Sequence, residues 1–353
     1  MKISSELSSK IKLSSFISMV LVVMIHSNNL STINTEPNSI TYWIESIISN
    51  GIARIAVPVF FITSGFLFFN NKIIKYPQFF YNQIKKRVYT IGLPFVLWSL
   101  FGLLTFSFLQ LIPQIKPYYN NFELSDLTVK LFIEKWLIYP VPFQLWFLQI
   151  LLVCTILSPI IWKLLTFKTL KNIYLFTILT LWFFWGGYNG LTEYFFEGLL
   201  FFSIGAWIAI NNITITIHPK KSWIITLTLL TLILLYFKFF FEIKRLWEIS
   251  ILFGKLSILT GIPVYWQLIS STYKKFENFR FINFSFWLFL AHEPLLTFIK
   301  KTLTILSLYI THYHSPLIVY ILAPLITITV TIYLGKLISF NHPKLYAFLT
   351  GNR

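Results

Sequence analysis

The stretch IKLSSFISMVLVVMIHSNNL, residues 11–30, decides the fold class of this chain. Its apolar run follows Lys10 and Lys12 and is long enough to enter a lipid bilayer, which a helix of about 20 apolar residues crosses. His26 arrives more than halfway along that crossing. A charged group at such depth costs roughly 2.5–3.5 kcal/mol on insertion scales, so His26 is a candidate functional residue. The alternative is a neutral helix-end histidine bonded to a backbone carbonyl.

The composition of the whole chain is typical of a membrane protein. Of its 353 residues, 56% are hydrophobic, 19% are aromatic and only 12% are charged. A soluble domain carries about 25% charged residues. The net charge of +17 would suggest nucleic acid for a soluble protein, but here the basic residues lie in short loops between apolar runs. We therefore expect membrane lipid, and no nucleic acid, as a partner.

About ten apolar segments are long enough to be membrane helices, which predicts an all-α polytopic protein with one domain, 1–353. The predicted spans are 13–30, 51–70, 88–112, 143–163, 172–187, 193–211, 222–241, 246–268, 281–300 and 316–338. The short link GYNGL predicts a tight helical hairpin between the fifth and sixth spans. The longest loops, 31–50 and 113–142, have room only for a helix or a turn. The first segment lacks an A-x-A-like cleavage site, so we expect it to be retained.

The distribution of charge in the loops predicts the orientation in the cell membrane. Most of the 29 lysines and arginines fall in the termini and in alternate loops, and basic loops stay in the cytoplasm. With an even number of spans, both termini are then cytoplasmic. The single cysteine, Cys154, excludes an internal disulfide and a CxxC metal site. We expect no bound metal.

Several polar residues inside the predicted spans are candidates for chemistry. Arg54 lies one turn into the second span, and Glu193 and Glu197 share a helix face at the start of the sixth. These glutamates would pair with Arg54, hold a sugar hydroxyl, or simply be solvated at the helix end. Trp146 opens the fourth span. The alternatives are snorkelling for Arg54 and the interfacial aromatic belt for Trp146.

A second intramembrane histidine, His292, lies near the middle of the ninth span and is followed by Glu293 and Pro294. A proline there is typical of an interrupted helix whose backbone faces a cavity. Two histidines in separate spans favour a function for at least one of them. Neither belongs to an HExxH metal motif, and the chain has no Walker loop or GxSxG nucleophile motif.

Five stretches, in this order, resemble the integral-membrane acyltransferase 3 family, which O-acylates cell-surface sugars. The stretches are LVVMIHS, RIAVPVFFITSGFLFF, KKRVYTIGLPFVLW, LWFLQILLVCTILSPII and FSFWLFLAHEPLL, and the ending KLYAFLTGNR is similar to a frequent ending in this family. The likeness spans nearly the whole chain.

The resemblance implies an enzyme that uses cytoplasmic acyl-CoA as a co-substrate and acylates a hydroxyl of a glycan or lipid-linked sugar. It marks His26 as the essential residue and extends to Arg54 and to Lys86 and Arg87. Many members carry an arginine where this chain has Ser15. Either Lys12, about one helical turn away, substitutes, or another cation binds the donor, or activity is lost.

We therefore expect a membrane-bound O-acyltransferase that moves an acetyl group or, alternatively, a succinyl or other acyl group. A base or transient acyl carrier, an oxyanion-binding cation and cations for the CoA phosphates are required. The expected catalytic residues are His26, Arg54 and His292; the expected donor-binding residues are Lys12, Lys85, Lys86 and Arg87; the expected acceptor-binding residues are Trp146, Glu197 and Glu293. Polysaccharide-synthesis machinery is a possible partner. A sugar or lipid transporter, with His26 and Glu293 as proton relays, is the alternative class.

Overall fold

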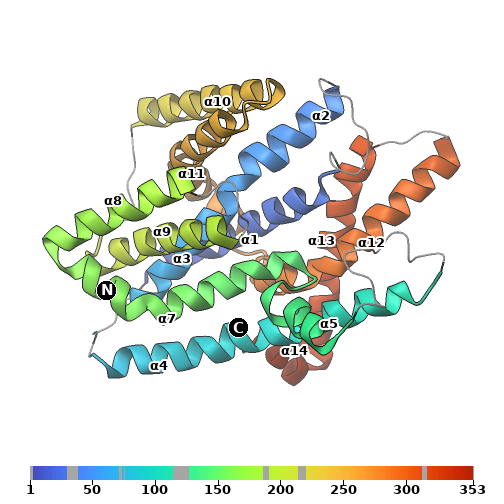
Figure 1. Ribbon diagram of the computed structural model, residues 1–353, viewed down its shortest axis with the longest axis horizontal. Helices are drawn as coiled ribbons and strands as arrows, with labels where there is room; N and C mark the ends of the chain where they lie inside the picture. Colours follow the sequence, from blue (N-terminus) through green and yellow to red (C-terminus); the bar gives the residue numbers. More distant parts are fainter. Residues whose placement is uncertain are drawn as a thin grey trace. The chain divides into compact units, whose positions relative to one another are not determined.

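The computed structural model describes residues 3–29, 39–70, 74, 76–113, 127–185, 191–213, 220–311 and 316–352. Every regular element in these ranges is a helix, which confirms the all-α prediction (Figure 1). The chain divides into two compact units. The first unit comprises Met1–Gln83 and Val153–Asn283, and the second comprises Ile84–Leu152 and Phe284–Arg353.

Nine helices in the described part of the chain are long and apolar enough to cross a membrane. They are Ser5–Ser27, Ile40–Phe69, Gln78–Gln110, Phe143–Thr166, Thr192–Ile210, Lys221–Ile243, Trp247–Phe276, Arg280–Ile310 and Pro316–Asn341. The predicted span 172–187 falls on a tenth helix, α8 (Lys168–Trp185), which is not among the nine because Lys168 and Lys171 lower its hydropathy. Most of the predicted hairpin link GYNGL lies outside the described residues.

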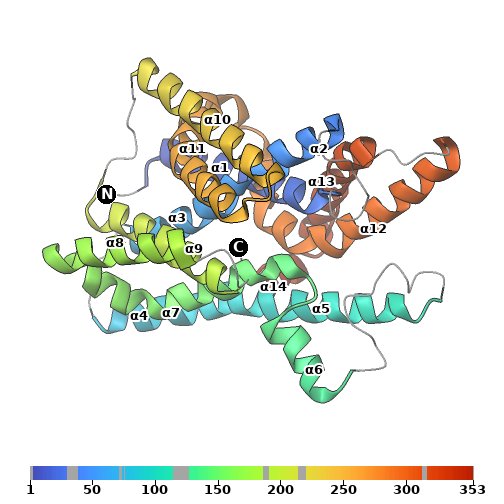
Figure 2. The same cartoon turned by 45° about the horizontal axis from the view of Figure 1, so that its top comes forward.

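The first unit is built around α1 (Ser5–Ser27), which packs against α3 (Ala56–Phe69) and α11 (Trp247–Phe276). In both views α11 lies beside α10 (Lys221–Ile243), while α3 pairs with α9 (Leu191–Ile210), which also contacts α8 (Figures 1 and 2). A Cβ atom on Gly65 of α3 would collide with the Phe202 backbone of α9, and one on Gly205 would collide with that of Ile62. Glycine at these two positions therefore permits this close helix crossing.

Hydrogen bonds and a cation–π contact hold α1 and α11 in an antiparallel arrangement. The Tyr265 hydroxyl donates to the Ser14 carbonyl (2.8 Å) and lies 2.9 Å from Ser18 Oγ. Nearer the start of α1, Lys10 Nζ lies 5.1 Å from the ring centroid of Tyr273 and 2.7 Å from Glu6 Oε1. Later residues of α1 thus contact earlier residues of α11, and the start of α1 lies beside the end of α11.

The second membrane helix begins earlier than predicted, inside the expected loop 31–50. It runs through α2 (Ile40–Glu45), a π-helical turn η1 (Ser46–Gly51) and a 3-10 turn η2 (Ile52–Ile55) before α3. Ser39 starts it as an N-cap, with its side chain accepting from the Tyr42 amide (3.1 Å). The apolar residues of 40–48 allow this extension, and η1 and η2 both pack against α1.

The second unit contains α5 (Leu93–Gln110), α12 (Ser285–Thr311), α13 (Pro316–Asn341) and α14 (Pro343–Leu349). Trp287 of α12 is central here: its indole donates to the Thr331 carbonyl (2.9 Å), and its ring packs against Trp98 and Tyr346. Trp98 in turn donates to the Leu349 carbonyl (3.1 Å), which ties α14 to α5. This packing fixes the first half of α12, the helix that carries His292.

Three further segments complete the second unit or join the two units. The helix α4 (Gln78–Arg87) continues through η3 (Val88–Gly92) into α5, and η7 (Phe143–Leu145) continues into α7 (Trp146–Thr166). Between them, α6 (Val129–Ile133) and the π-helical η6 (Glu134–Ile138) occupy part of the predicted loop 113–142 (Figure 2). Trp136 of η6 donates to the Val96 carbonyl (3.0 Å), so η6 packs against α5.

Candidate active site

His26 lies in the last turn of α1 and is partly exposed. The turn is held by two hydroxyls that donate to the Met24 carbonyl, Ser27 Oγ at 2.9 Å and Ser49 Oγ of η1 at 2.8 Å. His26 is 13 residues beyond Leu13, a rise of about 20 Å at 1.5 Å per residue, against a hydrocarbon core of about 30 Å. If the hydrocarbon core begins near Leu13, we therefore expect the imidazole past the middle of the bilayer, on a helix end that η1 supports.

Glu45, which the sequence analysis missed, lies beside the segment that follows His26. Its side chain is fully buried, and its Oε2 accepts from the Asn29 amide (2.8 Å), which is itself buried. A buried carboxylate needs such donors, since burial without them costs several kcal/mol. Glu45 is followed by the π-helical turn η1. Such turns are rare in proteins overall but are often found at functional sites. A lone acidic residue inside the apolar stretch YWIESII was the available signal.

Arg54 belongs to a charged cluster in the first unit, which we define as Arg54, Glu193, Glu197 and Lys255. Arg54 is exposed and its guanidinium donates to Asn50 Oδ1 (3.1 Å). Both Arg54 and Lys255 interact electrostatically with the two glutamates of α9. Lys255 is buried, and its ammonium donates to the Trp182 carbonyl (2.7 Å). The cluster joins η2, α9 and α11, so Glu197 interacts with cations from two other elements.

His292 and Glu293 lie in the second unit, at a break in α12. The backbone at Glu293 is non-helical (φ −108°, ψ 135°). Fully buried His292 places Nδ1 3.0 Å from the Leu288 carbonyl and 2.9 Å from the Phe289 carbonyl. Carbonyls only accept, so Nδ1 carries a proton; in a neutral ring Nε2 would then be the basic nitrogen. Glu293 Oε2 accepts from the Thr297 hydroxyl (2.8 Å) and amide (3.3 Å).

These two residues therefore cap the two halves of the broken helix, His292 the end of the first and Glu293 the start of the second. The interruption confirms the break expected at Pro294; a cavity facing its backbone stays a prediction. The break also gives both residues a structural task that is sufficient reason for their presence. Their parts in catalysis and acceptor binding stay predictions.

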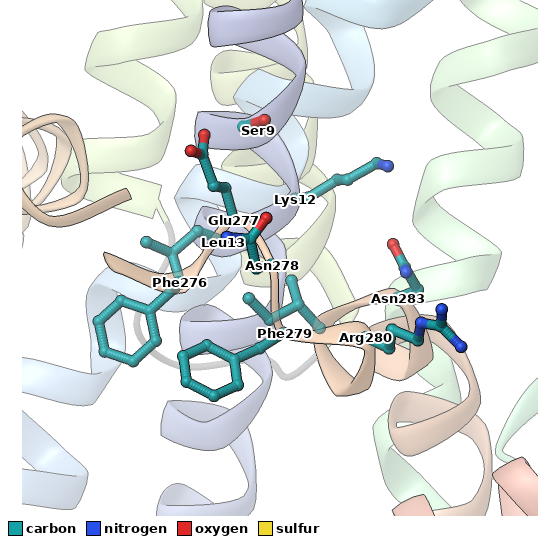
Figure 3. Close-up of a pocket in the computed structure, with 10 residues that line it drawn as sticks. Ser9, Lys12, Leu13, Phe276, Glu277, Asn278, Phe279, Arg280 and Asn283 are labelled. Atoms are coloured by element: carbon teal, nitrogen blue, oxygen red, sulfur yellow. The ribbon is translucent and has the colours of Figure 1, made fainter. Parts of the chain in front are cut away.

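Lys12 lines a cavity of about 110 Å³ between the first half of α1 and the segment that joins α11 to η8 (Arg280–Phe284). Figure 3 shows the Lys12 side chain extending toward the side on which Asn283 and Arg280 lie. Glu277 and Ser9 lie together on another side of the same cavity. Arg280 and Asn283 are binding candidates that the sequence analysis did not select, because only the folded chain brings them to Lys12.

The other predicted donor-binding residues, Lys85, Lys86 and Arg87, form the last turn of α4, and we name them the basic cluster. They belong to the second unit and the Lys12 cavity to the first. Trp146 begins α7 and is only 8% exposed, so it is packed inside its unit rather than displayed at the surface. Among the described residues, no three His, Cys, Asp or Glu side chains gather as a metal site would require.

Within the first unit, then, the structure places His26, Arg54, Glu197 and Lys12; within the second it places His292, Glu293, Trp146 and the basic cluster. Comparison with protein families matches residues 16–336 to the acyltransferase 3 family, as an acyltransferase domain. The chain belongs to the acyltransferase 3 family. The match covers most of both units, and the chain is thus a multi-pass membrane acyltransferase.

A curated relative supports this membership. The chain is 26% identical over 332 residues to the succinoglycan biosynthesis protein ExoH of Rhizobium meliloti (strain 1021), with 88% of this chain and 82% of that protein covered. No solved structure matches the chain.

Proposed function

We propose that this acyltransferase moves an acyl group from acyl-CoA to a hydroxyl of a surface polysaccharide or lipid-linked sugar at the cell membrane. The observation that carries the proposal is His26, an ionisable residue supported at the end of an intramembrane helix, in a chain whose family match includes that helix. The sugar acceptor is supported by the relative, whose name assigns it to the biosynthesis of succinoglycan.

The reaction moves the acyl group from the CoA sulfur to the acceptor oxygen, and the hydroxyl proton from that oxygen to the sulfur. His26 takes the proton of the acceptor hydroxyl while the hydroxyl oxygen attacks the thioester carbonyl carbon. The carbon–sulfur bond then breaks, the thiolate of CoA leaves, and the proton on His26 is returned to that sulfur. If His26 instead carries the acyl group, its nitrogen attacks the thioester carbonyl, the carbon–sulfur bond breaks and the CoA thiolate leaves. The acceptor oxygen then attacks the acyl-imidazole, the carbon–nitrogen bond breaks, and the hydroxyl proton passes to the thiolate.

A cation near the thioester oxygen would stabilise the negative charge that develops there. We assign this task to Arg54, which is exposed and lies on η2, a turn that packs against α1. Glu193 and Glu197 would keep Arg54 in place or bind hydroxyls of the acceptor, which sugar-binding carboxylates do as hydrogen-bond acceptors.

The acyl group is acetyl in our first proposal. Succinyl is a second candidate, favoured by the name of the relative. Purified protein in detergent, given labelled acetyl-CoA or labelled succinyl-CoA and a glycan acceptor, distinguishes the two. Transport across a membrane is impossible in detergent, so label on the glycan excludes the transporter alternative. Absence of transfer from both donors, with protein that binds the glycan, would contradict the proposed function.

A further inference from the structure

The cavity beside Lys12 has the chemistry of an anion site. Lys12, Arg280, Asn278, Asn283 and Ser9 supply donors, and Glu277 is its one acidic lining residue. Lys12, Arg280 and Asn283 lie on one side, away from Glu277 (Figure 3). An ammonium and a guanidinium next to an amide are a donor set suited to phosphate oxygens.

The helices beside the cavity, α1 and α11, are held together by contacts that do not involve Lys12. Lys10, two residues earlier, is 3% exposed, pairs with Glu6 at 2.7 Å and lies over the Tyr273 ring. Lys10 therefore belongs to the α1–α11 contact, whereas Lys12 is exposed and lines the cavity. The Tyr265 bonds to Ser14 and Ser18 fix the same two helices one turn further in. A ligand would meet a preformed site, which lowers the entropy lost on binding.

The size of the cavity limits what it holds. Sites for drug-sized molecules measure about 300–1,000 Å³, and this one measures about 110 Å³. It therefore suits a phosphate group rather than a whole nucleotide. The rings of Phe276 and Phe279, with centroids 5.9 Å apart and both exposed, line its edge and offer an apolar surface for a base.

The position of the cavity along α1 relates it to His26. Lys12 and His26 are 14 residues apart on one continuous helix, a separation of about 21 Å at 1.5 Å per residue. An extended pantetheine arm, which joins the phosphates of CoA to its thioester, is of comparable length. A donor with a phosphate at Lys12 would therefore reach the turn of α1 that carries His26.

We propose that the side of the cavity formed by Lys12, Arg280 and Asn283 binds a phosphate group of the acyl-CoA donor. This inference rests on the proposed function for the identity of the ligand. The same chemistry would suit the phosphate of an anionic lipid, so the test includes both sources. Arg280 and Asn283 become donor-binding residues, and Glu277 weakens the site by its charge.

The test measures binding of CoA, dephospho-CoA and pantetheine to purified full-length protein by titration calorimetry. Lys12→Gln and Arg280→Gln should each raise the Kd for CoA by about five- to tenfold, as expected for one charge-assisted contact in a partly solvated site. Glu277→Gln should lower that Kd. Lys275→Gln is the matched control, because Lys275 is an exposed cation at the same helix end that does not line the cavity; it should leave the Kd within twofold.

The inference is overturned if Arg280→Gln and Lys275→Gln weaken CoA binding equally, which would show a general effect of surface charge. It is also overturned if Arg280→Gln leaves CoA binding unchanged and instead reduces retention of phosphatidylglycerol from mixed phosphatidylcholine vesicles. Acyl transfer keeps the two proposals separate. Transfer with an unchanged KM in Arg280→Gln defeats this site alone, whereas cavity-dependent CoA binding without any transfer defeats the proposed function alone.

Discussion

Replacing His26 separates a catalytic histidine from a structural one. His26 is partly exposed, in the last turn of α1, so His26→Gln should change the free energy of unfolding by about 0.5 kcal/mol or less, as for other exposed sites. Glutamine keeps much of the side-chain size and hydrogen bonding but cannot take a proton. If His26 is the base or acyl carrier, turnover falls by at least about 100-fold, or about 2.7 kcal/mol of activation free energy.

His292 provides the contrast. It is fully buried and its Nδ1 faces two carbonyls, so His292→Ala leaves a cavity and removes their donor. The expected loss is about 3 kcal/mol of stability. Its effect on activity should therefore follow the amount of folded protein.

The assay is transfer of labelled acyl groups in detergent, at matched amounts of protein that elute as a single species in size-exclusion chromatography. Thermal unfolding of each variant supplies the stability scale. His26→Ala and His26→Gln should be equally inactive and equally well folded. Near-normal transfer by His26→Gln would remove His26 from the mechanism and direct attention to His292.

Further predictions concern other parts of the chain. A reporter fused after Arg353 or at the basic cluster should face the cytoplasm; the C-terminal result requires α8 to cross the membrane as a tenth span, and an outward C-terminus would refute that count. Replacing Lys86 and Arg87 together with Gln should raise the KM for acyl-CoA and reduce its salt dependence, unless the cluster only sets topology, in which case abundance alone falls. Glu45→Ala should lower both turnover and stability, by about 1–3 kcal/mol for the stranded amide of Asn29, and Glu45→Gln should restore stability in a melting experiment; full activity in both variants would exclude Glu45 from positioning the His26 segment. Gly65→Ala should destabilise the protein by about 2 kcal/mol or more because its Cβ meets backbone, whereas Gly92→Ala, with only ordinary contacts, should be tolerated in the same thermal assay.

The amino-acid sequence by itself was enough to determine the class of fold. Hydrophobic runs of bilayer length predict helices because backbone groups in lipid must be satisfied within the segment. Most predicted ends lie within four residues of the described membrane helices, but five helix ends extend 8–11 residues beyond the predicted spans. Two of the differences have local causes: the second helix starts at Ile40, where an N-cap at Ser39 and apolar residues extend it, and α8 is less apolar because of its first-turn lysines.

The sequence also singled out His26, since an ionisable group inside an apolar run is conspicuous without any structure. It predicted the break at Pro294 because proline cannot continue the hydrogen bonds of a helix. The sequence alone therefore identifies those site residues that stand out as a single ionisable residue or a proline within an apolar segment.

Only the tertiary structure brought together residues that are distant along the chain. The meeting of Lys12 with Arg280 depends on the antiparallel contact of α1 with α11, which Tyr265 and Tyr273 fix through bonds that no periodicity encodes. Glu45 becomes a candidate site residue only when the structure shows that its carboxylate accepts from the backbone amide of Asn29. Likewise, His292 looks catalytic in the sequence, but its contacts with two carbonyls show a capping task. Hydrophobicity decides which segments enter the membrane, whereas side-chain packing between helices decides which polar groups meet there.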